Sequence, residues 1–76
     1  MKKRENTSRF SFNKGFSQVR RRDVRDVTDE IMGILNLKNR QSFYQRRHGK
    51  IEPKVTEYEA IEAVFNKYDI TDVWGE

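Results

Sequence analysis

The spacing of apolar residues constrains the fold of this chain more than any other feature. Two sets recur at steps of three and four: Val24, Val27, Ile31 and Ile34/Leu35, then Ile61, Val64, Phe65 and Tyr68. Such spacing places each set on one face of an α-helix. Only Phe10 and Phe12 alternate with polar residues, which predicts a short extended piece there. We therefore predict an all-α fold.

Local signals predict where the first two helices begin and end. Ser17 is a plausible N-cap for a helix over 17–35, and Asn36 ends it because Asn tolerates the left-handed conformation. Asn39 can cap a second helix over 39–48, which Gly49 stops. A break near Thr28 would divide the first helix and give four helices in place of three.

The third helix begins after Pro53, which forces an extended residue before it. The sequence Thr56-Glu57-Tyr58-Glu59 matches a capping box, with Thr56 as the cap. Val73 and Trp74 follow this helix and can fold back onto the core. We divide the chain into a flexible basic and aromatic N-terminal arm over 1–16 and a helical domain over 17–76.

Length and composition argue against an enzyme. A chain of 76 residues buries only about 60% of its unfolded surface, so a deep substrate cavity is not expected. Cysteine is absent and His48 is the only histidine, so we expect no metal site, no cofactor and no small-molecule substrate. No apolar run approaches the roughly 20 residues of a membrane span, and no secretory signal is evident, so we expect a cytoplasmic protein.

Charge is divided unevenly along the chain. Residues 1–50 hold 14 Lys or Arg and 5 Asp or Glu, whereas residues 51–76 hold 2 and 7. This polarity indicates an oriented electrostatic surface, for which nucleic acid is the commonest partner. The rings of Phe10, Phe12 and Phe16 either help to close a small core or order a basic arm that meets the ligand.

The stretch NRQSFYQRRHGK, residues 39–50, concentrates basic residues on the second predicted helix. Arg40 can donate twice to guanine, and Gln41 can bond adenine in the same bidentate way. Tyr44 shares the face of Arg40, whereas Phe43 points away and anchors the helix in the core. The full set of predicted DNA-binding residues is Lys38, Asn39, Arg40, Gln41, Tyr44, Gln45, Arg47, His48 and Lys50.

About half of the chain, from Thr28 to Thr71, resembles the lambda-repressor-like (Cro-type) helix-turn-helix domains. The matching pieces are Leu35-Asn36-Leu37, His48-Gly49-Lys50, Pro53 and Tyr68-Asp69-Ile70. Asn36 stands where those domains carry glycine, and Met32 stands where they carry a small residue. The resemblance implies a recognition helix near 39–48 in the major groove, and a short regulator of the phage or mobile-element type.

We therefore expect a sequence-specific protein that binds double-stranded DNA, with a homodimer on a symmetric site as a further expectation. The alternative is a small protein-interaction module, such as a phage assembly factor or an inhibitor, whose basic face docks on an acidic partner. An RNA-binding protein is a second rival. Binding to random duplex DNA at low salt separates the first two functions.

Overall fold

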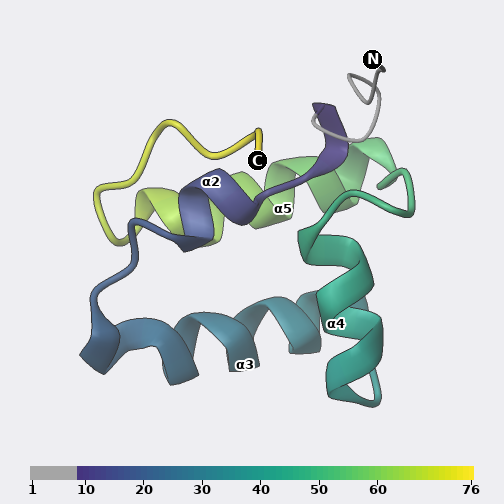
Figure 1. Cartoon of the computed structure of the whole chain (residues 1–76), viewed down its shortest axis with the longest axis horizontal. Helices are drawn as coiled ribbons and strands as arrows, with labels where there is room; N and C mark the ends of the chain where they lie inside the picture. The colour runs from purple at the N-terminus through teal and green to yellow at the C-terminus, as the bar shows by residue number, and fades with distance from the viewer. Residues whose placement is uncertain (1–8) are drawn as a thin grey trace.

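The computed structural model describes residues 9–76, and within them every regular element is helical (Figure 1). The elements in chain order are α2 (Asn13–Phe16), the 3₁₀ turn η1 (Arg21–Asp23), α3 (Val24–Leu35), α4 (Arg40–Arg47) and α5 (Val55–Asn66). The predicted all-α class is confirmed. Residues 1–8 of the predicted arm lie outside the described residues.

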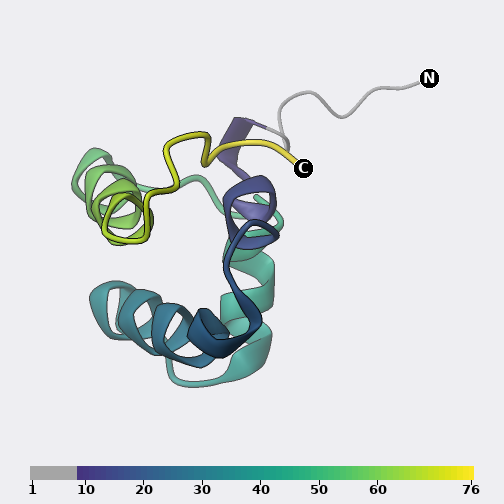
Figure 2. The same cartoon turned by 90° about the vertical axis from the view of Figure 1, so that its left-hand side faces the viewer.

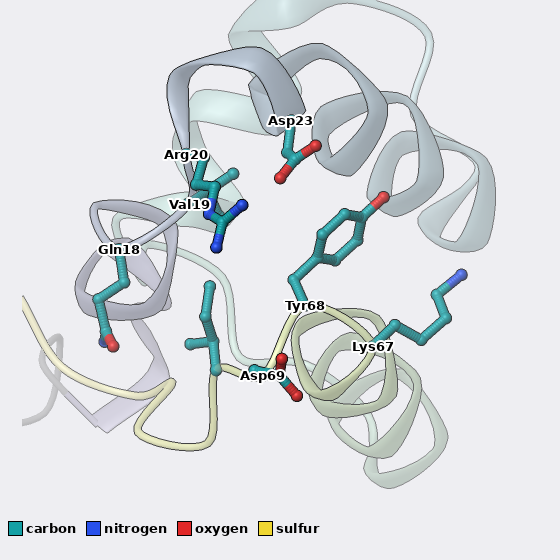
Figure 3. A pocket seen from close by; sticks show the side chains of 8 residues that line it. Gln18, Val19, Arg20, Asp23, Lys67, Tyr68 and Asp69 are labelled. Atoms are coloured by element: carbon teal, nitrogen blue, oxygen red, sulfur yellow. The ribbon is translucent and has the colours of Figure 1, made fainter.

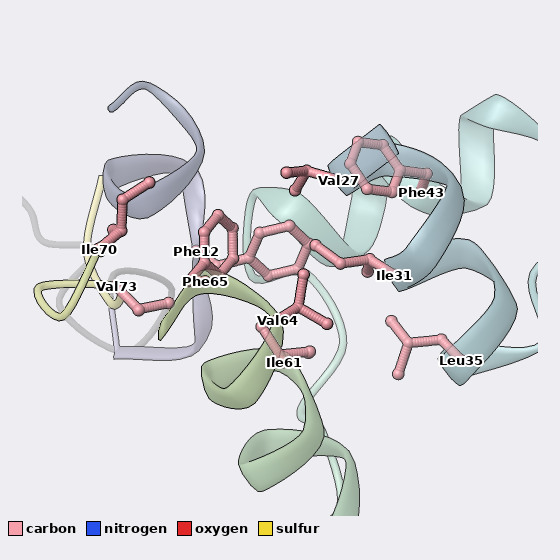
Figure 4. Packing of buried hydrophobic residues seen from close by; sticks show 10 residues of the cluster. All are labelled: Phe12, Val27, Ile31, Leu35, Phe43, Ile61, Val64, Phe65, Ile70 and Val73. Carbon is pink, nitrogen blue, oxygen red and sulfur yellow. The ribbon is translucent and has the colours of Figure 1, made fainter. Parts of the chain in front are cut away.

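The two longest helices, α3 and α5, lie side by side and pack on each other (Figures 1 and 2). Helix α4 runs across their direction, and the turn 36–39 joins it to α3. Buried residues from all three helices form one cluster with residues of the two flanking segments (Figure 4): Phe12, Val27, Ile31, Leu35, Phe43, Ile61, Val64, Phe65, Ile70 and Val73. The predicted apolar stripes therefore form the core.

Phe12 lies at the centre of this core and is 1% exposed. Its ring contacts those of Phe43 and Phe65, with centroid distances of 5.9 Å in both cases. Arg9 and Phe10 are helical, and α2 follows directly after Phe12. The predicted extended piece is therefore wrong, Ser11 and Phe12 are buried, and Phe16 packs against the core. Of the two interpretations of the Phe10, Phe12 and Phe16 rings, the structure supports closing of the core for Phe12 and Phe16, whereas Phe10 is not part of the core cluster.

The segment after α5 returns across α2, as Figure 1 shows in yellow. The first-turn amides of α2 have no partner within a helix of one turn, and tail carbonyls accept from them. Lys14 N donates to Gly75 O and Gly15 N donates to Val73 O, both at 2.9 Å. Gly75 N in turn donates to Ser11 O at 2.7 Å. The predicted return of Val73 and Trp74 to the core is confirmed.

Each long helix ends at one residue in the left-handed conformation. The three residues are Asn36 (φ 57°), Gly49 (φ 76°) and Asp69 (φ 64°). In each case the next amide donates to the carbonyl five residues back: Leu37 to Met32 (2.9 Å), Lys50 to Gln45 (3.0 Å) and Ile70 to Phe65 (3.1 Å). This is the Schellman arrangement, which satisfies carbonyls that the helix leaves open. The predicted stops at Asn36 and Gly49 are confirmed.

Two predicted helix starts are wrong. The helix predicted from Ser17 begins at Val24, because Arg20 is extended (ψ 146°) and the Ser17 hydroxyl donates to Lys14 O at 2.8 Å instead of capping a helix. No break occurs at Thr28. The capping box was predicted two residues too late, at Thr56 and Glu59 in place of Lys54 and Glu57.

Helix α5 begins at Val55, and Glu57 rather than Glu59 accepts from the backbone of the cap residue. The Lys54 amide donates to Glu57 Oε1 at 3.0 Å, and Arg46 Nη1 approaches the same oxygen at 3.1 Å. The second contact comes from α4. This tertiary contact favours a helix start at which Glu57 accepts from the cap residue, and a capping rule based on local sequence does not include it.

Candidate nucleic-acid interface

Helix α4 has one buried side and one exposed side. Asn39 caps it as predicted: its side-chain oxygen accepts from Ser42 N at 2.8 Å. Phe43 is 7% exposed and makes edge contacts with the rings of Phe12 and Phe16, at centroid distances of 5.9 and 5.5 Å. The predicted anchoring role of Phe43 is confirmed, and it fixes which face of α4 is left outside.

The outer face of α4 carries most of the predicted binding residues. Tyr44 is 54% exposed, in contrast to its neighbour Phe43. Gln45 is half-buried. The other exposed members lie on α4 or next to its ends and carry charged or amide side chains: Lys38, Asn39, Arg40, Gln41 and Lys50. These side chains provide hydrogen-bond donors and positive charge on one end of the molecule.

Arg47 performs a structural task inside the protein. Its Nε donates to Asn13 Oδ1 at 2.7 Å, and its guanidinium lies over the ring of Phe16, 4.7 Å from the centroid. Its carbonyl accepts from Ser11 Oγ at 2.8 Å and from Phe12 N at 3.0 Å. Arg47 therefore links α4 to α2, and only part of its guanidinium remains for a ligand.

His48 also faces inward. Its ring lies 4.3 Å from that of Tyr44, and its Nε2 is buried with no hydrogen-bond partner among the residues that the structure describes. Desolvation lowers the pKa of His48, and the positive charges of Arg47 and Lys50 lower it further. The imidazole is therefore neutral near pH 7, and its Nε2 is not placed to meet a phosphate.

Arginines from η1 and α3 extend the basic surface beyond α4. Arg21 and Arg25 line the same open hollow as Arg40, together with Val24, Thr28 and Asp29. Arg40 lies 15 or more residues after Arg21 and Arg25 in the sequence. The predicted site did not include Arg21 or Arg25, although the run Arg20-Arg21-Arg22 was a visible signal. Asp29 places one carboxylate among these cations.

A second hollow lies where η1 faces the end of α5 (Figure 3). Two basic residues, Arg20 and Lys67, and two acidic residues, Asp23 and Asp69, line it. Lys67 forms an ion pair with Glu30 at 2.7 Å. Desolvation raises the pKa of Tyr68, which lines the same hollow. The mixture of charges gives this hollow no net preference for a polyanion, unlike the surface around Arg40.

Within residues 9–76 no group of three or more acidic, histidine or cysteine side chains is arranged to hold a metal ion. No helix in that range combines the length and apolarity that crossing a membrane requires. No protein-family model, curated protein or solved structure matches the chain.

Proposed function

We propose that this protein binds double-stranded DNA, with α4 in the major groove. The observation that carries the proposal is the two-sided construction of α4. Phe43 fixes the helix to the core, whereas Arg40, Gln41 and Tyr44 are exposed to solvent. A rigid helix with donors on its exposed side fits a groove that admits one α-helix.

In this proposal, residues in the first turn of α4 contact the edges of the DNA bases. Arg40 is placed to donate to the O6 and N7 atoms of guanine, and Gln41 to pair with N6 and N7 of adenine. Tyr44 follows one turn later on the same side. The helix N-terminus carries a partial positive charge, which adds to the attraction for phosphates.

Non-specific affinity comes from charge around the hollow. Arg21 and Arg25 flank Arg40 there, so they can neutralise phosphates on either side of the groove. The likeness of residues 28–71 to lambda-repressor-like domains supports the same orientation and extends the proposal to a transcriptional regulator of the phage or mobile-element type. A homodimer on two symmetric half-sites belongs to that proposal.

The test is selection of a binding site from random duplexes, followed by titration of single-base variants. Arg40→Ala should cost about 1–3 kcal/mol and relax the preference at one base pair. Arg21→Ala should weaken all duplexes alike. The matched control is Lys54→Ala, which removes an exposed positive charge next to the start of α5. An enriched symmetric site supports dimeric binding.

Equal losses for Arg40→Ala and Lys54→Ala would refute the role of α4. If the protein fails to bind duplex DNA at low salt, the basic face has another partner, such as an acidic protein. Tighter binding of single-stranded RNA than of duplex DNA would assign the surface to RNA.

A further inference from the structure

An apolar hollow rimmed by carboxylates lies at the start of α5, beyond the Arg46–Glu57 pair. Its apolar lining comes from Phe10, Pro53, Val55 and Tyr58, and its acidic rim from Glu52, Glu59 and Glu62. Val55, the first residue of α5, is 74% exposed, and Ile51, in the connector before it, is 43% exposed. Neither residue belongs to the core cluster, so packing of the fold does not explain why these two positions carry apolar side chains.

The wall of this hollow is held firmly. Tyr58 stacks on Trp74 with a centroid distance of 4.1 Å and an interplanar angle of 5°. Trp74 Nε1 donates to Glu62 Oε2 at 2.7 Å, which fixes the indole and the carboxylate together. Trp74 also contacts the core ring of Phe12 at 6.2 Å. The hollow therefore presents a preformed surface rather than a loose loop.

Its size and charge define an occupant. The volume is about 430 Å³, which falls within the range of about 300–1,000 Å³ typical of binding pockets. Residues 51–76, which supply all of the lining except Phe10, carry 7 acidic and 2 basic residues. Carboxylates around an apolar floor complement a segment in which Lys or Arg flanks an apolar side chain.

We infer that this hollow docks a basic segment of a partner protein, with one aliphatic or aromatic side chain against Val55, Pro53 and Tyr58. The rim carboxylates Glu52 and Glu59 then pair with Lys or Arg on either side of that anchor. A symmetric contact between two copies of this chain fits less well, because it would bring the two acidic rims together. DNA is disfavoured by the same charges. The inference does not depend on the proposed DNA-binding function.

The experiment is a selection from a random peptide library displayed on phage, with the full chain as bait. The enriched peptides should carry Lys or Arg around one large apolar residue. A representative enriched peptide, made synthetically and labelled with fluorescein, is then titrated against variants by fluorescence anisotropy. Val55→Ser and Glu59→Lys should each weaken its binding at least fivefold, and both positions are exposed, so the fold should persist.

Matched controls lie on α3, away from the lining of this hollow. Ile34→Ser removes another exposed aliphatic side chain, and Asp26→Lys makes the same charge change as Glu59→Lys. Neither should alter peptide affinity by more than twofold.

Three results of the peptide experiments would overturn the inference: no enrichment over the Glu59→Lys bait, enriched peptides without basic residues, or equal losses in the controls. Sedimentation that shows a dimer abolished by Val55→Ser would assign the hollow to a second copy, and would also overturn it.

Discussion

Two glycines with opposite surroundings show how single residues set the packing of this chain. A Cβ on Gly15 would lie 3.0 Å from Val73 Cα and 3.2 Å from Val73 O. A Cβ on Gly33, near the C-terminal end of α3, would meet no atom within 4 Å. The first glycine permits the tail to approach α2, whereas the second only adds flexibility to a helix.

Gly15→Ala should therefore destabilise the protein by about 1–3 kcal/mol, because the backbone at Val73 has to move. Gly33→Ala should stabilise it by about 0.5–1 kcal/mol, as expected for an exposed helix interior. Urea unfolding of both variants measures the difference. Equal effects would mean that the contact between Gly15 and Val73 does not constrain the tail.

Asp29 places an exposed carboxylate in the hollow that Arg21, Arg25 and Arg40 line. If this surface faces phosphates, Asp29→Asn should tighten DNA binding, because one repulsive charge is removed. The gain should be about 0.2–1 kcal/mol, the usual range for exposed charges. Glu59→Gln, on α5, is the control for a change in net charge, and both affinities are measured at the same ionic strength. A gain of equal size in the control would contradict the proposed orientation.

At the scale of elements, the helix ends were easier to predict than the starts. Asn36, Gly49 and Phe43 follow local rules, namely tolerance of positive φ and apolar spacing, and the structure confirms all three. The prediction of a helix start at Ser17 was wrong because the Ser17 hydroxyl bonds at the end of α2 and the backbone is extended at Arg20. Both features depend on the docking of the C-terminal tail against α2, which no local sequence pattern encodes.

The placement of the predicted binding residues could also be predicted only where local rules decide it. Exposure of Gln41 and Tyr44 follows from helical periodicity once Phe43 is placed inside, whereas Arg40, three residues before Phe43, is exposed as the first residue of the helix. The internal roles of Arg47 and His48 do not, because they depend on α2, which was predicted to be part of an arm. The hollow that joins Arg21 to Arg40 requires the crossing of α3 and α4, which spacing within one helix does not specify.

Asn36 offers a direct test of the left-handed helix ends. Asn36→Ala should lower the free energy of unfolding by about 1 kcal/mol, because a Cβ without a polar partner disfavours φ near 57°. Asn36→Gly should be neutral or stabilising. Asn66→Ala, an exposed Asn to Ala change in the last turn of α5, serves as the control and should leave stability almost unchanged. Thermal unfolding of the set checks the order.

Glu57 connects the start of α5 to α4, and its contribution depends on pH. The hydrogen bond from the Lys54 amide lowers the pKa of Glu57, and Arg46 lowers it further. A carboxylate with a lowered folded-state pKa stabilises the fold above its ordinary value of about 4.3, and this contribution is lost as pH falls through the folded value. Glu57→Gln should therefore show a smaller loss of stability between neutral and acidic pH than the wild type.

Denaturant unfolding at a series of pH values measures this slope. Glu59→Gln is the control, because Glu59 is exposed. Parallel curves for the wild type and Glu57→Gln would show that the Lys54 and Arg46 contacts do not hold the carboxylate in its ionised form.

At the scale of the whole molecule, charge separates two surfaces. Basic residues gather on α4 and η1 and include Arg25 of α3, a helix that also carries Asp26, Asp29 and Glu30, whereas acidic residues gather at the start of α5. The proposed DNA surface and the proposed peptide surface are therefore of opposite sign, so each repels the ligand of the other. This arrangement favours one protein that contacts DNA and a basic partner at the same time.

Salt dependence tests the DNA surface as a whole. If about six phosphates are neutralised, affinity should fall about a thousandfold between 50 and 200 mM salt, because bound counterions are released. Fluorescence anisotropy with a random duplex measures the slope. A nearly flat dependence would contradict binding through the basic surface.

The hydrogen bonds of Lys14 and Gly15 with Gly75 and Val73 have a consequence for synthesis in the cell. A ribosome completes residues 73–75 only after all the helices have been made. Until then α2 lacks its partners, and the Phe12 ring lacks the neighbouring Trp74. Helices can form early, but the nascent chain cannot close its core around Phe12 before translation has passed residue 75. A nascent chain that is stalled on the ribosome before Val73 should therefore remain sensitive to protease. The complete chain, stalled after a linker long enough to clear the exit tunnel, should be protected.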